Sequence, residues 1–317
     1  MLLRDRFIIF ASNIGCYLRH PILLLKFRRR LGRWPWPARP ADYWNKILWR
    51  KLFDRNPDFT RFSDKLLYKS WIGSRYPGIR TAAVLWTGTV ASDIPFEAFV
   101  GRPVVLKPNH GSRHSIFFVN QTTKDHQAVL RTAERWLNES HGWRTGEWGY
   151  GGVQRKLFVE VEIVAPPGSE TVDCNCFCAM GRFIYCRVIL DIGTPDERTA
   201  FFDRDGRRLT GTSLGKLGAK SPLPDDFRLP EAYFVAVSAA EEISQDMDFV
   251  RIDFLVAEEE IYALECTWYP GAGYTQYSDA AIPRAFHEAW DIRHSWFMTS
   301  TGHRLMETYK SALRRCL

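Results

Sequence analysis

Two acidic residues near the carboxyl end of the sequence are spaced so that they would face each other across a hairpin. Asp253 lies in the run RIDF and Glu265 in the run ALECTWYPG, with a tight turn expected at residues 257–260. A turn centred there brings the two carboxyl groups opposite each other. Because two adjacent carboxylates between apolar residues are costly to bury in ionised form without a cation, the pair is a candidate magnesium site. The alternative is a pair of solvated strand residues.

Two neighbouring side chains extend this candidate site. Thr267 follows Glu265 by two residues and Arg251 precedes Asp253 by two, so strand alternation predicts that all four share one face. Paired oxygen ligands with a nearby hydroxyl suit Mg²⁺. An arginine on the same face can meet an anion at the metal.

A second stretch with chemical potential is VVLKPNHGSRHS at residues 104–115, where Lys107 ends an apolar run and a polar turn follows. Taken alone, the stretch is typical of an ordinary strand and turn. Beside a magnesium hairpin, however, a lysine and exposed backbone amides are the parts that hold a nucleoside triphosphate. We therefore predict that Lys107, Asp253 and Glu265 converge on one cleft.

The elements that must position these residues are short strands preceded by helices. From about residue 80, β-branched and aromatic runs alternate with turns, and helices are expected at 124–137 and near 230–246. Residues 41–72 repeat apolar side chains at helical spacing and predict a helical lead-in. Strands separated by only a few residues, as in RIDFLVAEEEIYALE, are antiparallel, which predicts an α+β fold.

Positive charge is concentrated at the amino end. Residues 1–60 hold 13 Lys and Arg against 4 Asp and Glu, whereas the remaining residues hold 30 against 32. The apolar stretch in residues 1–37 is too short to span a bilayer, but Arg28, Arg29 and Arg30 with Trp34 and Trp36 suit contact with an anionic membrane surface. The equal alternative is a basic helix packed on the body. Without an extended positive track, nucleic-acid binding is not expected.

The seven cysteines have no regular spacing, which favours a reducing compartment over a disulfide scaffold. Cys174, Cys176 and Cys178 would stand in a row on one strand face, where they cannot converge on one zinc ion without distortion. We interpret them as small buried side chains.

Four motifs in this order resemble those of the ATP-grasp superfamily, and in particular its teichuronopeptide-biosynthesis (TupA-like) branch: VVLKPNHGS, KLFVEVEI, CFCAMGRFIYCRV and VRIDFLVAEEEIYALECTWYPGAG. The lead-in resembles that branch too, so the likeness covers roughly residues 40–280. It implies an ATP-grasp fold, with two α+β subdomains of mainly antiparallel sheets that clasp a nucleotide. The implied parts are a basic helical region (1–75), a lid and first subdomain (76–158), and a second subdomain with the magnesium hairpin and a terminal helix (159–317).

The resemblance implies ATP as cofactor and assigns residues to it. Lys107 would contact the phosphates and Lys156 would be a second lysine near the base and phosphates. The lid turn over the phosphates would consist of His110, Gly111 and Ser112. The hinge strand whose backbone reads adenine would consist of Glu160, Val161, Glu162 and Ile163.

The resemblance likewise assigns the catalytic and metal roles. Mg²⁺ would be held by Asp253, Glu265 and Thr267, and Arg251 would steady an acyl phosphate. Arg187 could clamp a carboxylate or phosphate, although a surface arginine is the alternative.

The implied activity is that of an ATP- and Mg²⁺-dependent carboxylate–amine ligase. It would link an amino acid or amine to a uronate or peptide-like component of a bacterial surface polysaccharide, in the cytoplasm at the inner face of the membrane. The alternative is an inactive protein of the same fold that binds an anionic glycan or a membrane surface. The chain departs from the branch in three places: Thr267 replaces an asparagine, Arg113 a glycine, and Asp173-Cys174-Asn175 an Asp-Tyr-Lys triplet.

Overall fold

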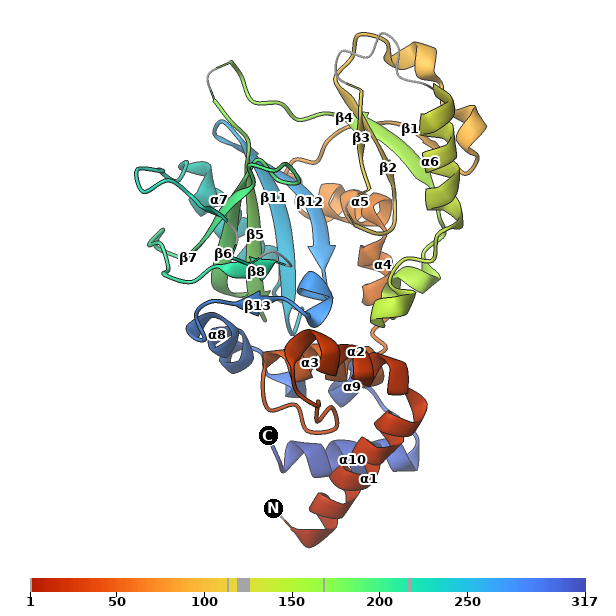
Figure 1. Cartoon of the computed structure of the whole chain (residues 1–317), viewed down its shortest axis with the longest axis vertical. Coiled ribbons are helices and arrows are strands. Elements are labelled where there is room, and N and C mark those ends of the chain that lie inside the picture. The colour runs from red at the N-terminus through yellow and green to blue at the C-terminus, as the bar shows by residue number, and fades with distance from the viewer. Residues whose placement is uncertain (1, 113, 119–125, 168, 216–217, 220) are drawn as a thin grey trace.

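Two mainly antiparallel sheets form the upper part of the molecule in Figure 1, and helices from both ends of the chain form the lower part. The computed structural model describes residues 2–112, 114–118, 126–167, 169–215, 218–219 and 221–317. Arg113 and the first residues of the helix expected at 124–137 lie outside these ranges. The predicted α+β class is confirmed.

The first sheet has four antiparallel strands in the order β1 (Val84–Gly88), β4 (Leu157–Val161), β2 (Val104–Pro108) and β3 (Ile116–Phe117). Its apolar face packs against α6 (His126–Asn138) through Val104, Leu106, Leu157 and Val159. Since side chains alternate along a strand, the opposite face carries Lys107 and the residues paired with it. The lysine is thereby directed away from the apolar layer.

The second sheet has six strands, and only the β10–β7 pair is parallel. The strand order is β10 (Ser221–Pro222), β7 (Arg198–Phe202), β6 (Arg182–Leu190), β5 (Val172–Ala179), β11 (Val250–Ala257) and β12 (Glu260–Thr267). Cys174, Cys176 and Cys178 are fully buried in the core with α7 (Ala232–Ile243), and all seven cysteines are free thiols. The prediction that they are buried side chains is confirmed.

The remaining elements are short. A small sheet consists of β13 (Gln276–Tyr277), β8 (Ser213–Gly215) and β9 (Gly218–Ala219). The 3₁₀ turns are Ala91–Asp93, Phe96–Phe99, Trp143–Thr145, Trp148–Gly152, Pro270–Gly273 and Ile292–His294. Two helices, α8 (Ala281–Ala289) and α9 (Trp296–Thr299), follow the second sheet.

The predicted helical lead-in consists of α3 (Tyr43–Phe53), α4 (Asp58–Ser63) and α5 (Lys65–Arg75). The carboxylate of Asp64 caps α5 by accepting hydrogen bonds from the backbone amides of Leu66 and Leu67. Both α4 and α5 pack against β12, while the backbone N–H of Lys65 donates to the carbonyl of Asn109, just after β2. The lead-in therefore joins the two sheets.

A buried arginine fastens α3 to the second sheet. Arg50 is fully buried, and its guanidinium donates to Asp248 Oδ1 at 2.7 Å and to the carbonyl oxygens of Phe249 and Trp268 at 2.9 and 2.8 Å. Asp248 also accepts from Trp290 Nε1 at 2.8 Å. This network satisfies a buried charge pair and fixes the orientation of the lead-in.

Two helices from opposite ends of the chain lie against each other at the lower end of Figure 1: α1 (Leu3–Arg19) and α10 (Arg304–Arg314). The Arg315 guanidinium donates two hydrogen bonds to the Asp5 carboxylate at 2.8 and 2.9 Å. In the described residues, no single helix is long and apolar enough to cross a membrane; α1 and α2 (Pro21–Leu31) pass that test only as a pair bent by 96°.

Two of the expected part boundaries need correction. Residues 157–161 form one strand of the first sheet, so the first subdomain extends past 158 to Val161. The terminal helix α10 was assigned to the second subdomain, but it packs on α1 of the basic region. The bonds from Arg315 to Asp5 hold this contact.

Candidate active site

The hairpin β11–β12 presents the two predicted acids on one face. Asp253 lies opposite Glu265, and Arg251 lies opposite Thr267. The Arg251 guanidinium donates to both carboxylate oxygens of Asp253 at 2.6 and 2.5 Å and to the Thr267 hydroxyl oxygen at 3.2 Å. Its Nη2 atom is also 3.6 Å from Glu265 Oε1. The register predicted from strand alternation and the turn is therefore found.

The electrostatics of this hairpin keep both acids charged near neutral pH. Burial raises the pKa of Asp253 to about 6, against the opposing effect of Arg251. Burial would also raise the pKa of Glu265, but the charges of Lys65, Arg251 and Lys107 together lower it. Lys65 links this hairpin to the first sheet, because its Nζ lies 3.4 Å from Glu265 and donates to the Gly111 carbonyl in the turn that follows the Lys107 strand.

Lys107 belongs to a buried charge cluster on the first sheet. Its Nζ lies 2.7 Å from Glu160 Oε1, and the Nζ of Lys69 lies 2.8 Å from the other oxygen of Glu160. Burial would raise the pKa of Glu160, but the two lysines lower it. A phosphate group that approaches Lys107 would therefore meet a cation already oriented by Glu160.

Two lysines at this site were not predicted from the sequence. Lys65 lies 3.4 Å from Glu265 through Nζ and donates to the carbonyl oxygen of Gly111, while Lys69 pairs with Glu160. Both belong to α5, and their spacing of four residues in KLLYK places them on one helical face. That spacing was the available signal, but the face that α5 turns to the sheets depends on tertiary packing.

The polar turn after β2 is anchored by Asn109. Its side-chain amide donates to Asp64 Oδ2 at 2.8 Å, and its side-chain oxygen accepts from the Lys156 backbone amide at 2.8 Å. Gly111 has φ of +81°, and a Cβ there would meet the His141 ring at 3.0 Å, so glycine is required.

Within the predicted lid turn, the side chains of His110 and Ser112 differ in exposure. His110 is only 1% exposed, so its side chain packs inward and only its backbone is left to face a ligand. Burial, with Arg155 and Lys65 nearby, lowers the pKa of His110 to about 4, and the ring is neutral at pH 7. Ser112 keeps an exposed side chain and can still act as part of a lid.

The predicted hinge strand is shorter than expected. Glu160 and Val161 end β4, whereas Glu162 and Ile163 follow it as irregular backbone. The Glu162 amide donates to the Pro103 carbonyl at 2.9 Å, which holds this segment beside β2. Burial raises the pKa of the Glu162 carboxyl. Burial raises the pKa of Asp64, and the charge of Lys156, which lies just before β4, is among the effects that oppose this rise.

Arg187 lies on the same sheet face as the acids. It pairs across β6–β5 with Asn175, which pairs in turn with Asp253, and its Nη2 donates to Asn175 Oδ1 at 3.0 Å. Among the described residues, no carboxylate forms an ion pair with Arg187, and its Nε is buried without a hydrogen-bond partner. Arg187 is half-buried, and its Nη2 lies beside the strand that carries Asp253.

The hairpin supplies too few oxygen ligands to bind Mg²⁺ alone, but enough to share the ion with the phosphates of a nucleotide. In the part of the chain that the structure describes, no three His, Cys, Asp or Glu side chains gather into a metal site. Asp253 and Glu265 supply two carboxylates and Thr267 a hydroxyl, while Mg²⁺ prefers six oxygen ligands and commonly takes several from phosphates and water. Their donor chemistry therefore fits a metal shared with a triphosphate.

A buried acid beside the site gives a pH-dependent prediction. Burial, with Asp253 nearby, raises the pKa of Asp173 to about 7. The folded chain then binds this proton more tightly than the unfolded chain between about pH 4 and 7, so the free energy of unfolding falls as pH rises through that window. We expect Asp173→Asn to flatten this fall and to stabilise the ligand-free protein at pH 8 by on the order of 2–4 kcal/mol. Urea unfolding at pH 5 and pH 8 measures this, and equal pH dependence in both proteins would contradict it.

Comparison with known proteins identifies the class to which this fold and site belong. The fold is that of the ATP-grasp proteins. The chain belongs to the TupA-like ATP-grasp family, whose model matches residues 45–288. A comparison with curated proteins found no match.

Solved structures of ATP-grasp ligases are similar at low identity. D-alanine–D-alanine ligase from Bacillus anthracis, complexed with ATP, is 16% identical over 65% of this chain and 55% of that chain, with a TM-score of 0.37. L-amino acid ligase from Bacillus licheniformis is 13% identical over 67% and 42%, with a TM-score of 0.37. Phosphoribosylamine–glycine ligase from Thermotoga maritima is 11% identical over 68% and 50%, with a TM-score of 0.38. The chain thus spans about half the length of these proteins.

Proposed function

We propose that the protein is an ATP- and Mg²⁺-dependent ligase that joins a carboxylate to an amine through an acyl phosphate. The observation that carries this proposal is the placement of cations beside the hairpin acids: Arg251 donates to Asp253, and Lys65 lies 3.4 Å from Glu265 while it also donates to the Gly111 carbonyl in the turn after the Lys107 strand. Cations for phosphates and carboxylates for a metal, on facing elements, are what a bound metal–triphosphate requires.

Each residue has a role in this proposal. Bound Mg·ATP supplies the phosphoryl group that activates the carboxylate. Asp253, Glu265 and Thr267 would hold the metal, and Lys107 would orient the phosphates. Arg251, which pairs with Asp253, would be released to stabilise charge on the transferred group where Asp253 ligates a metal. The segment from Glu160 to Ile163, with Lys156, binds the base.

The substrates that we propose are an amino acid or amine and a uronate or peptide-like component of a bacterial surface polysaccharide. The resemblance of the four motifs to the teichuronopeptide-biosynthesis branch motivates this assignment. Because such glycans are assembled on lipid carriers at the inner face of the membrane, we place the protein in the cytoplasm at that surface.

Arg187 gives a prediction about substrate specificity. A half-buried guanidinium without a carboxylate partner in the described residues suits a substrate carboxylate, so Arg187→Gln should raise KM for the carboxylate substrate about 10- to 100-fold. The KM for ATP should change less than about threefold, and Arg182→Gln, an exposed arginine at the start of the same strand, is the matched control. Steady-state kinetics distinguishes these outcomes, and an equal rise in both KM values would show a general loss of structure instead.

The activity is tested by ADP release with Mg²⁺, ATP and a panel of amino acids, with and without glycans that contain uronic acid. We expect release above background only when a matching carboxylate and amine are both present. Flat rates across the panel, together with no ATP binding by calorimetry, would contradict the ligase and favour the second candidate, an inactive protein that binds an anionic glycan or membrane surface.

A further inference from the structure

The exposed face of α1 carries a continuous apolar stripe. Leu3, Phe7 and Leu18 are 84%, 71% and 78% exposed, and Phe10 and Ile14 lie between them at helical spacing. The opposite face, with Asp5, Ile9, Asn13 and Cys16, is buried against the body. Because Arg315 pairs with Asp5, the helix is fixed with this apolar stripe outward.

The apolar surface continues beyond α1. Ile22 and Leu25 of α2, and Trp34 and Trp36 after it, are also exposed. The Trp36 ring lies 6.3 Å from that of Phe10, and the Trp34 ring lies 5.9 Å from that of Tyr17, which joins the tryptophans to α1. Single exposed apolar residues are common on protein surfaces, but a contiguous apolar surface of this kind is typical of a site that binds a partner or a membrane.

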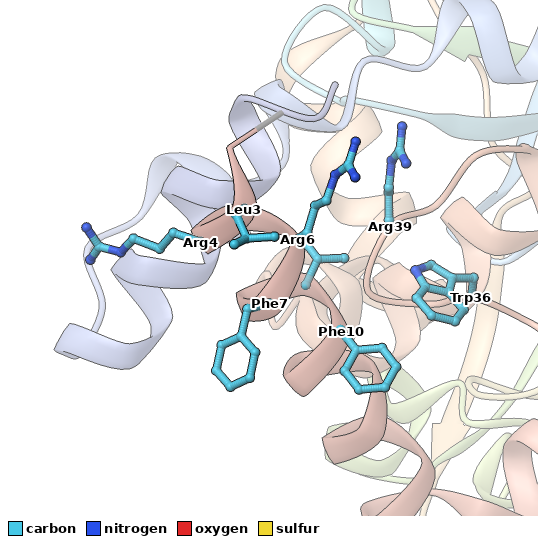
Figure 2. A pocket seen from close by; sticks show the side chains of 8 residues that line it. Leu3, Arg4, Arg6, Phe7, Phe10, Trp36 and Arg39 are labelled. Carbon is cyan, nitrogen blue, oxygen red and sulfur yellow. The ribbon is translucent and has the colours of Figure 1, made fainter.

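An open hollow of about 890 Å³ lies between α1 and the segment that contains Trp36 and Arg39. Figure 2 shows Phe7, Phe10 and Trp36 on its wall, with Arg6 and Arg39 extended in the same direction. The lining is Leu3, Arg4, Arg6, Phe7, Ile9, Phe10, Trp36 and Arg39. An apolar wall beside three arginines fits the acyl chain and phosphate of an anionic lipid.

The cations around this surface are available for an external anion. Within the described ranges, no ion pair is formed by Arg4, Arg6, Arg28, Arg29, Arg30 or Arg39. Arg33 pairs with Asp42 at 2.9 Å, and the Arg28 guanidinium lies 4.4 Å from the Trp34 ring centroid. A second copy of the chain would bring two such basic surfaces together, so charge favours an anionic partner instead.

We infer that the surface formed by α1, α2 and residues 34–39 binds an anionic phospholipid bilayer, and that the hollow takes one acyl chain while Arg6 and Arg39, which extend in the same direction, contact lipid phosphate. The stripe lies in the plane of the interface, with its apolar side chains in the acyl boundary and the arginines at the headgroups. The bend of 96° between α1 and α2 suits this placement. The inference goes beyond the proposed reaction and does not depend on it.

The test is sedimentation of the full chain with vesicles of phosphatidylglycerol and phosphatidylcholine, or of phosphatidylcholine alone. We expect binding to be at least about tenfold stronger to the anionic vesicles and to weaken in high salt. The double variant Phe7→Asp/Phe10→Asp should lose at least about tenfold of this binding. Ile192→Asp/Val235→Asp, which places the same two charges at exposed apolar residues after β6 and on α7, should bind as wild type.

Quenching of tryptophan fluorescence by brominated acyl chains tests the hollow itself. We expect quenching in the wild type and a smaller quench in Trp36→Phe. The inference would be overturned by equal binding to both kinds of vesicle, by unchanged binding of the double variant, or by no quench from Trp36. It would also be overturned if the surface formed a dimer of the chain that Phe7→Asp dissociates. Unchanged ATP turnover of the double variant in solution would separate this result from the fate of the ligase proposal.

Discussion

Asp253→Asn and Glu265→Gln, made singly, are expected to lower Mg²⁺-dependent ADP formation by about 100- to 1000-fold. Each change keeps the size of the side chain but removes a negative charge from the metal, so charge on the transferring phosphoryl group is no longer balanced. The loss is expected in kcat, and ADP formation under saturating ATP measures it.

The matched control is Glu259→Gln, since Glu259 is an exposed acid in the turn of the same hairpin. It should keep wild-type activity. If either of the two hairpin variants retained more than half of the wild-type rate while folded, the assignment of the metal to this face would be wrong.

The largest effect on stability is expected for Arg50→Met. The change removes the hydrogen bond from Arg50 to the buried Asp248 carboxylate, which keeps the bond from Trp290. Breaking a buried ion pair in this way costs about 3–5 kcal/mol of the free energy of unfolding. For a protein of this size the midpoint of thermal unfolding should fall by on the order of 10 °C. Circular dichroism at increasing temperature measures the shift.

A double variant shows whether the unpaired charge causes that loss. Arg50→Met/Asp248→Asn should recover part of the stability, because the uncompensated carboxylate is gone. A fall below about 1 kcal/mol for Arg50→Met, or no recovery in the double variant, would mean that Arg50 contributes through packing alone.

The hairpin was predictable because its geometry is local. Strand alternation and one tight turn sufficed to place Asp253 opposite Glu265 and Arg251 on the same face. The same local reasoning placed the three neighbouring cysteines in the core. In both cases the residues concerned are close in the sequence, so the backbone period alone fixes their side.

Features that depend on tertiary packing were not predictable in this way. Lys65 reaches Glu265, and Lys69 reaches Glu160, only because α5 lies between the two sheets. The salt bridge between Lys107 and Glu160 likewise joins residues that are 53 positions apart in the sequence. The inward position of the His110 side chain is another such feature, because it accompanies the anchoring of the turn by the bond from Asn109 to Asp64. The end of β4 at Val161 likewise follows from pairing with β1 and β2.

The interpretation of the amino end as a basic helix packed on the body holds for one side of α1, and contact with a membrane stays a proposal for the other side. The helix packs on the body through Asp5 and Ile9, and it exposes Phe7 and Phe10 on the other side. The sequence pattern could identify an apolar stripe, but only the position of α10 decides which side is covered.

The most direct test of the proposed site is a crystal structure with Mg²⁺ and a non-hydrolysable ATP analogue. We expect the triphosphate in contact with Lys107, a metal held by Asp253 and Glu265, and Arg251 no longer paired with Asp253. An analogue bound away from these residues, with the Arg251–Asp253 pair intact and no metal at the hairpin, would contradict it.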